Sequence, residues 1–274
     1  MIDGLFADKI VILNYKGDFM KRIASFLLVF AIIFSLAACS GKDNSQAENT
    51  APPVIQDTVH TRKFTDESGK TVIKVKVTLP QIVDNCDEKI KNHINALALS
   101  EFKNACEFAE NNIENASNFM KSMGSDKPWS KTVTFESTLV NNRYACFFVK
   151  ESLSYFDSET NPSWRTVCYD VKTGAECTLS DFATIPEEAD ICFEAFLSDV
   201  LAPALPMRFT NPSYLTEETY EKLIEIVSPQ NFYLTENGLG VYFNKKDIHE
   251  YLSGTFKISF TWDELVSVYA LPEK

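Results

Sequence analysis

Alternating apolar and polar residues predict strands in several parts of the chain. Residues 71–79, TVIKVKVTL, place Val or Ile at every second position, which is typical of a half-exposed strand, and we expect this strand to end at Pro80. Residues 131–140 and 144–155 read as two strands joined by a turn at Asn141 and Asn142. Shorter strands are expected at residues 164–171, 176–179, 232–234, 240–243 and 256–260, with hairpin turns at Gly174 and at Asn237-Gly238.

A spacing of three to four residues predicts helices elsewhere. Between residue 87 and about residue 119 the apolar positions recur at this period, so we expect one long amphipathic helix packed across a sheet. Residues 186–205, which begin with a proline and two acids, predict a second helix, and Thr216 is expected to cap a third that ends at Pro229. Residues 262–268 are expected to form a short closing segment. The elements are grouped by type, which favours the α+β class: antiparallel sheets packed by one long and two shorter helices, in two closely associated subdomains.

The N-terminal region reads as an export signal. Residues 20–39, MKRIASFLLVFAIIFSLAAC, combine a positive start, an apolar run and small residues before Cys39, an ending that resembles a bacterial lipobox. A transmembrane helix is the alternative, but an apolar run of about 16 residues is shorter than the roughly 20 needed to span a bilayer. We therefore expect cleavage before Cys39, lipid attachment to its sulfur and an extracytoplasmic location.

These features predict an order of segments. Codons for Lys16 to Phe19 can encode a ribosome-binding sequence just before Met20, so we interpret residues 1–19 as a miscalled start and residues 20–38 as the signal peptide. Residues 39–62 are polar and are expected to form a disordered spacer. We expect the folded part to comprise an N-terminal half, residues 63–160, and a C-terminal half, residues 161–274.

Charge narrows the classes of partner. The chain carries a net charge of −12. An acidic surface repels phosphate backbones, so nucleic-acid binding is not expected. Such a surface suits a cationic partner, although solubility alone also explains it. With 45% hydrophobic residues, the chain can bury a substantial core.

Cysteine and histidine usage argues against a zinc site, and we expect no metal and no cofactor. The three His are scattered, and none of the seven Cys forms a Cys-x-x-Cys pair. Without Cys39, six Cys remain, an even number that permits but does not require disulfides outside the cell. Cys86 and Cys106 lie among apolar residues and are expected to be free thiols.

Three motifs carry a resemblance to a known family. They are YDVKTG at 169–174 followed by LSDF at 179–182, FYLTENGL at 232–239, and VYF at 241–243 followed by DIHEYLSG at 247–254. Their order and spacing resemble the extracytoplasmic domain of RsiV-type anti-sigma factors, which also precedes the catalytic domain of PdaC-type peptidoglycan deacetylases. The resemblance covers roughly residues 65–270. It identifies a fold better than a function.

The sequence also departs from this family. No deacetylase motif and no sigma-binding segment is present, and we find no nucleophile elbow, paired-His motif or phosphate-binding loop, so we do not expect an enzyme. Where many relatives carry a Gly-Gly-Ala-His-like stretch, residues 156–164 read FDSETNPSW.

The resemblance implies a surface-displayed binding or sensing module for a lysozyme-like cationic protein. We expect the ligand surface at this divergent loop, formed by Tyr155, Phe156, Asp157, Glu159 and Trp164, although core packing explains the aromatic residues equally well. Cell-wall glycan is the rival ligand, and a structural envelope lipoprotein without a ligand is the third reading. We expect a monomer, held at the membrane through its N-terminal lipid.

Overall fold

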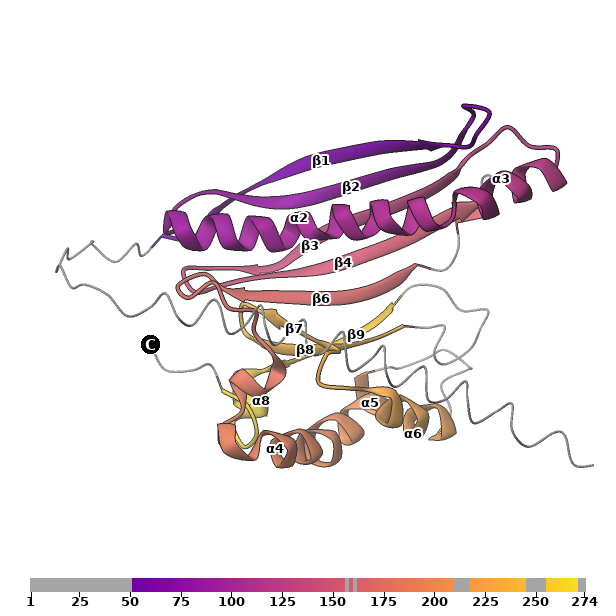
Figure 1. Ribbon diagram of the computed structural model, residues 1–274. Coiled ribbons are helices and arrows are strands. Elements are labelled where there is room, and N and C mark those ends of the chain that lie inside the picture. The colour runs from indigo at the N-terminus through magenta and orange to yellow at the C-terminus, as the bar shows by residue number, and fades with distance from the viewer. Residues whose placement is uncertain (1–50, 156–157, 160–161, 209–216, 245–254, 271–274) are drawn as a thin grey trace, which may run out of the picture. The chain divides into compact units, whose positions relative to one another are not determined.

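The computed structural model describes residues 51–155, 158–159, 162–208, 217–244 and 255–270, and it confirms the α+β class. Two sheets form the folded part, with helices packed against each (Figure 1). The expected start, signal peptide and lipid site at Cys39 lie outside the described residues.

The first sheet has six strands. They are β1 (Val54–Thr65), β2 (Thr71–Asp84), β3 (Trp129–Val140), β4 (Tyr144–Tyr155), the two-residue β5 (Ser158–Glu159) and β6 (Ser163–Asp170). The order is β1-β2-β3-β4, with both β5 and β6 paired to β4. All pairs are antiparallel except β2 and β3, which run parallel because two helices connect them. This parallel pair is a difference from the purely antiparallel sheets that we expected.

Helices α2 (Glu88–Asn111) and α3 (Ile113–Ser122) cover one face of this sheet (Figure 1). The Asp87 carboxylate caps α2 by accepting hydrogen bonds from the amides of Lys89 and Ile90. The expected single helix is interrupted at Asn112, whose side-chain amide donates to the carbonyl oxygen of Phe108 and whose backbone is not helical. A side chain that competes for helix carbonyls at this point explains the break.

The second sheet is antiparallel and carries the remaining helices. Its strands are β7 (Phe232–Thr235), β8 (Gly238–Asn244) and β9 (Thr255–Thr261), in that order. The helical segments are η1 (Leu179–Phe182), η2 (Pro186–Glu188), α4 (Ala189–Ala195), η3 (Phe196–Leu201), α5 (Ala202–Arg208), α6 (Glu217–Ile226) and α8 (Trp262–Leu265). Figure 1 shows α4, α5, α6 and α8 on the side of β7–β9 that faces away from the first sheet.

The two faces of the first sheet bury different cores. On β4, Phe147 and Val149 pack against the core beneath α2, whereas Cys146 and Phe148 face the second sheet. The Oγ1 atom of Thr166 on β6 donates a hydrogen bond of 2.5 Å to the carbonyl oxygen of Phe232 on β7. The sheets are therefore joined by a shared core and by a polar contact.

Three sequence expectations need correction. Strand β1 begins at Val54, so the spacer expected at residues 39–62 cannot extend beyond residue 53; the pairing of β1 with β2 compensates for its polar composition. Strand β2 continues past Pro80 because its pairing with β3 ends at Val77, which leaves a strand neighbour on one edge only, where a residue without an N–H is tolerated. The boundary expected between residues 160 and 161 cuts through the first sheet, since β6 pairs with β4.

Candidate functional site

Of the residues expected to form the ligand surface, Tyr155 and Trp164 lie on opposite faces of the first sheet. Tyr155 packs against Phe119 and Trp129, with ring centroids 5.8 and 4.6 Å away, on the face covered by the helices. Trp164 lies opposite Lys150 on β4 and packs with Phe148, on the face toward the second sheet. Because alternate residues of a strand point to opposite faces, Tyr155 and Lys150 are on different sides of β4.

Phe156 and Asp157 lie outside the described residues. Glu159 is described as a backbone position of β5, opposite Ser154, and its side chain is not.

Trp164 is engaged by neighbouring cations. The ammonium groups of Lys150 and Lys257 lie 6.0 and 5.8 Å from its ring centroid, and Lys257 also lies 3.7 Å from the ring centroid of Phe148. The cation–π contacts of Lys257, which lies on β9, connect the two sheets. They give the indole an intramolecular role.

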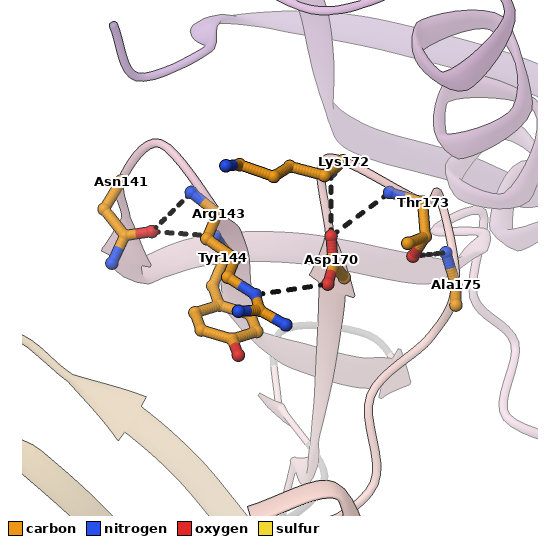
Figure 2. A network of polar contacts seen from close by, with 7 residues as sticks. All are labelled: Asn141, Arg143, Tyr144, Asp170, Lys172, Thr173 and Ala175. Atoms are coloured by element: carbon orange, nitrogen blue, oxygen red, sulfur yellow. Dashed lines mark hydrogen bonds and ion pairs between the residues drawn. The ribbon is translucent and has the colours of Figure 1, made fainter. Parts of the chain in front are cut away.

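The motif at 169–174 forms a polar network that holds two turns together (Figure 2). One carboxylate oxygen of Asp170 accepts from the amides of Lys172 and Thr173, at 2.8 and 3.1 Å. Its other oxygen accepts from Nε of Arg143 at 3.4 Å, which reaches across from the turn between β3 and β4. Gly174 completes the turn with a φ of 80°. We therefore assign the motif a structural role. The contacts of Asp170 bind backbone amides of its own turn and the side chain of Arg143 in the neighbouring turn.

Two ion pairs lie beneath α2. Lys131, which is only 7% exposed, pairs with Glu151 and places its ammonium 4.6 Å from the ring centroid of Phe108. Arg165 pairs with Glu101 at 2.5 Å. A cavity of about 90 Å³ beside Lys131 and Glu151 is well below the roughly 300–1,000 Å³ typical of ligand pockets. We assign these pairs to the packing of the helix on the sheet.

The C-terminal third of the chain concentrates its negative charge. Residues 176–274 contain 17 Asp and Glu against six Lys and Arg, a net charge of −11 out of −12 for the whole chain. Between Lys172 and Arg208 the sequence has no Lys, Arg or His. Seven of these acids lie within residues 176–208, which include the helical segments from η1 to α5.

Six carboxylates of this layer form what we call the acidic helical face: Asp181, Glu187, Glu188, Asp190, Glu194 and Asp199. All six side chains are exposed, and none forms an ion pair with a described Lys or Arg. On α4 the opposite side is apolar, with Cys192 buried in the core and Phe196 following at the start of η3. The helical period thus turns acids outward and core residues inward.

Exposed apolar side chains lie among these acids. Ile191 is 60% exposed and Ile185 is 43% exposed, although Ile is among the residues most often buried. Ile191 directly follows Asp190 on α4, one turn before Glu194. An apolar centre within a charged rim is the arrangement found at protein–protein interfaces. The sequence alone shows that this region contains acids and no basic residues. The structure is needed to show which of its apolar residues are exposed.

Two further results bear on the class of site. Within the described ranges, no group of three or more His, Cys, Asp and Glu is arranged to hold a metal ion. No helix in those ranges is long and apolar enough to span a membrane.

Comparisons with known proteins match part of the C-terminal half of the chain. Residues 192–263 match the family described as "Protein of unknown function (DUF3298)", so a DUF3298 domain is present. A crystal structure of a DUF3298 family member from Bacteroides fragilis superposes with a TM-score of 0.53 and 15% identity, over 82% of this chain and 96% of that one. At this identity the likeness shows the fold alone. A DUF3298 family protein from Pseudomonas aeruginosa gives a TM-score of 0.49 and 11% identity, over 81% and 96% of the two chains. No curated protein matches the chain.

Proposed function

We propose that this protein is a non-catalytic binding module, held outside the cytoplasm by lipid on Cys39, whose acidic helical face captures a cationic, lysozyme-like protein. The observation that carries the proposal is the acidic helical face itself. Its six exposed carboxylates lie on the same run of helical segments as the exposed Ile191, and none forms an ion pair with a described Lys or Arg.

Electrostatics supports a cationic partner. A surface on which one sign of charge accumulates attracts the opposite sign over about one Debye length, roughly 8 Å at physiological salt. Such attraction raises the association rate and selects the partner. The apolar side chain of Ile191 supplies the contact area that charges alone do not, because buried apolar surface contributes about 25 cal/mol per Å².

The family resemblance supports the identity of the partner. RsiV-type domains bind lysozyme, a strongly basic protein, and the motifs at 169–174 and 232–239 resemble that family. The DUF3298 match begins at Cys192, so this domain contains Glu194 and Asp199 of the acidic helical face. This proposal does not require the divergent loop at 156–164, because it locates binding on the helices that cover the second sheet.

Calorimetric titration of lysozyme into the full-length protein tests the proposal. Binding should be measurable and should weaken as salt is raised. Glu187→Gln, Glu188→Gln and Glu194→Gln together should reduce the affinity about tenfold, since each rim charge contributes up to about 1 kcal/mol. The matched control is Glu67→Gln, Glu107→Gln and Glu114→Gln, three exposed carboxylates on the first half of the fold, which should change the affinity little.

Three results would count against this proposal, each for a different reason. Absence of heat and of lysozyme inhibition at low salt would exclude this partner. Equal losses in the two triple variants would indicate an effect of net charge and not of the acidic helical face. Sedimentation of the protein with purified peptidoglycan, unaffected by salt, would favour the glycan alternative.

A further inference from the structure

Three cysteines lie in one row across β4, β6 and the segment that follows the turn after β6. Cys146 on β4 is directly opposite Cys168 on β6, and the two form a disulfide. Beyond the turn that follows β6, Tyr169 pairs with Glu176, and the amide of Cys177 donates a 2.7 Å hydrogen bond to the carbonyl oxygen of Cys168. Antiparallel register therefore places Cys177 opposite Cys168 on its other side.

All three sulfur-bearing side chains point to the same face. Cys146 and Cys168 belong to the core between the sheets, and Cys177 packs against that core. Tyr169, one residue after Cys168, belongs instead to the core beneath α2. Since residues opposite one another on neighbouring strands share a face, Cys168 has a potential disulfide partner on each side.

We propose that the row is a thiol–disulfide exchange site in which Cys168 is the shared member and its bond passes between Cys146 and Cys177. In the exchange, the Cys177 thiolate attacks Sγ of Cys168. The bond between Sγ of Cys168 and Sγ of Cys146 breaks, a bond between Cys168 and Cys177 forms, and Cys146 leaves as a thiolate. The proton that Cys177 has given up is balanced by the one that Cys146 takes, so no external oxidant or reductant is consumed.

Strand spacing restricts which bonds can form. Directly opposite residues of an antiparallel pair have Cα atoms about 4.5–5.5 Å apart, which suits a disulfide. Cys146 and Cys177 are two strand spacings apart, about 9.6 Å, which exceeds the roughly 7 Å limit for a disulfide without backbone movement. Bonds between Cys168 and either neighbour are therefore allowed, and a bond between Cys146 and Cys177 is not.

The exchange would move a covalent link within the fold. The Cys146–Cys168 bond joins β4 to β6, whereas a Cys168–Cys177 bond would close the turn that contains the Asp170 network (Figure 2). The exchange would thus decide whether the covalent link holds the sheet or the turn.

The surroundings of Cys177 set the rate. Burial, reinforced by the carboxylates of Asp170 and Asp181 and opposed by Arg143, raises the pKa of the Cys177 thiol to about 12. The phenol of Tyr144 also interacts electrostatically with this thiol. Little thiolate is present at neutral pH, so exchange in the folded protein should be slow and should accelerate roughly tenfold per pH unit.

Disulfide mapping of the full-length protein provides the test. The protein is oxidised with glutathione disulfide, its free thiols are alkylated, and it is digested without reduction for mass spectrometry. The wild type should give a Cys146–Cys168 link with Cys177 alkylated, and Cys146→Ser should give a Cys168–Cys177 link. The matched variants are Cys177→Ser, which should keep Cys146–Cys168, and Cys168→Ser, which should leave both Cys146 and Cys177 alkylated.

Two results would overturn the proposal. One is a folded Cys146→Ser protein in which both Cys168 and Cys177 are alkylated, and the other is a Cys146–Cys177 link in Cys168→Ser. If Cys146→Ser does not fold, wild-type protein incubated at pH 9 with a trace of glutathione decides instead. A Cys168–Cys177 link with alkylated Cys146 should then appear in a growing fraction, and its absence after prolonged incubation counts against exchange.

Discussion

Arg143 and Asp170 join two turns that are 27 residues apart in the chain. Nε of Arg143 donates to Oδ2 of Asp170 at 3.4 Å, while Oδ1 of the same carboxylate accepts from two amides of its own turn (Figure 2). Asp170, a residue that is 9% exposed, therefore fixes the end of β6 and contacts the turn between β3 and β4.

Replacing Asp170 should destabilise the fold. In Asp170→Ala, two amides lose their acceptor and the guanidinium loses its partner, and each such loss costs about 1 kcal/mol or more. We expect urea denaturation to show a loss of about 2–3 kcal/mol in the free energy of unfolding. Asp170→Asn keeps one acceptor oxygen and should lose less. Asp126→Ala, at an exposed ion pair with Lys70, is the control and should change stability by less than about 1 kcal/mol.

Gly174 and Gly69 allow the cost of backbone conformation to be separated from the cost of contact. Their φ angles are 80° and 81°, but a Cβ on Gly174 would lie 3.3 Å from the ring of His93 and 3.4 Å from Ile90 on α2, whereas a Cβ on Gly69 would have nothing within 4 Å. Both Gly→Ala variants should lose about 1–2 kcal/mol from the left-handed conformation. Thermal unfolding should show the larger loss for Gly174→Ala. Equal losses would mean that α2 yields to the added methyl group at no cost.

Asp66 should give the fold an acid-sensitive contact. Hydrogen bonds from the hydroxyl groups of Ser68 and Ser117 lower the pKa of Asp66 from 3.8 to about 2. A pKa that is depressed in the folded state stabilises the fold above the unfolded-state pKa, and this stabilisation is lost as pH falls from about 4 toward 2. The difference in urea midpoint between wild type and Asp66→Asn should therefore be constant near neutrality and shrink across that window. A difference that stays constant down to pH 2 would contradict the assignment.

The Lys131–Glu151 pair should respond asymmetrically to substitution. Glu151→Ala leaves the ammonium of Lys131 buried without its carboxylate, which should cost about 2–3 kcal/mol, less than for a fully buried pair because the Glu151 side chain is 37% exposed. Lys131→Met combined with Glu151→Leu should recover most of this loss, because apolar residues of similar size suit the site. Chemical denaturation measures both. Glu110→Ala, at the exposed pair with Arg62, should have little effect.

The strands that face a core were predictable because burial of one face imposes alternation. Residues 131–140 and 144–155 were expected as strands, and β3 and β4 occupy these positions within two residues. Strand β1 was missed because it is an edge strand whose residues are mostly exposed, so its sequence carries no apolar alternation. Parallel pairing of β2 with β3 depends on the path of the connecting helices, which local sequence does not encode.

The expected binding surface shows that residues close in sequence need not share a face of the fold. Tyr155 and Trp164 are nine residues apart, but the register of β4 and β6 places them on opposite faces of one sheet. The row formed by Cys146, Cys168 and Cys177 requires the same knowledge of register. The run of acids that forms the acidic helical face was visible as composition, whereas the exposure of Ile191 depends on which side of α4 packs on the core.

Strand β1 lies at the border of its sheet and follows the segment that we expect to tether the protein. Molecules confined to a membrane surface meet one another far more often than molecules free in solution, and an open strand border is where neighbouring copies would fuse into a continuous sheet. The charged side chains of Asp57, Arg62 and Lys63 are exposed along β1, and such a fusion would strip them of water. On a membrane, these charges would keep neighbouring copies from joining through β1.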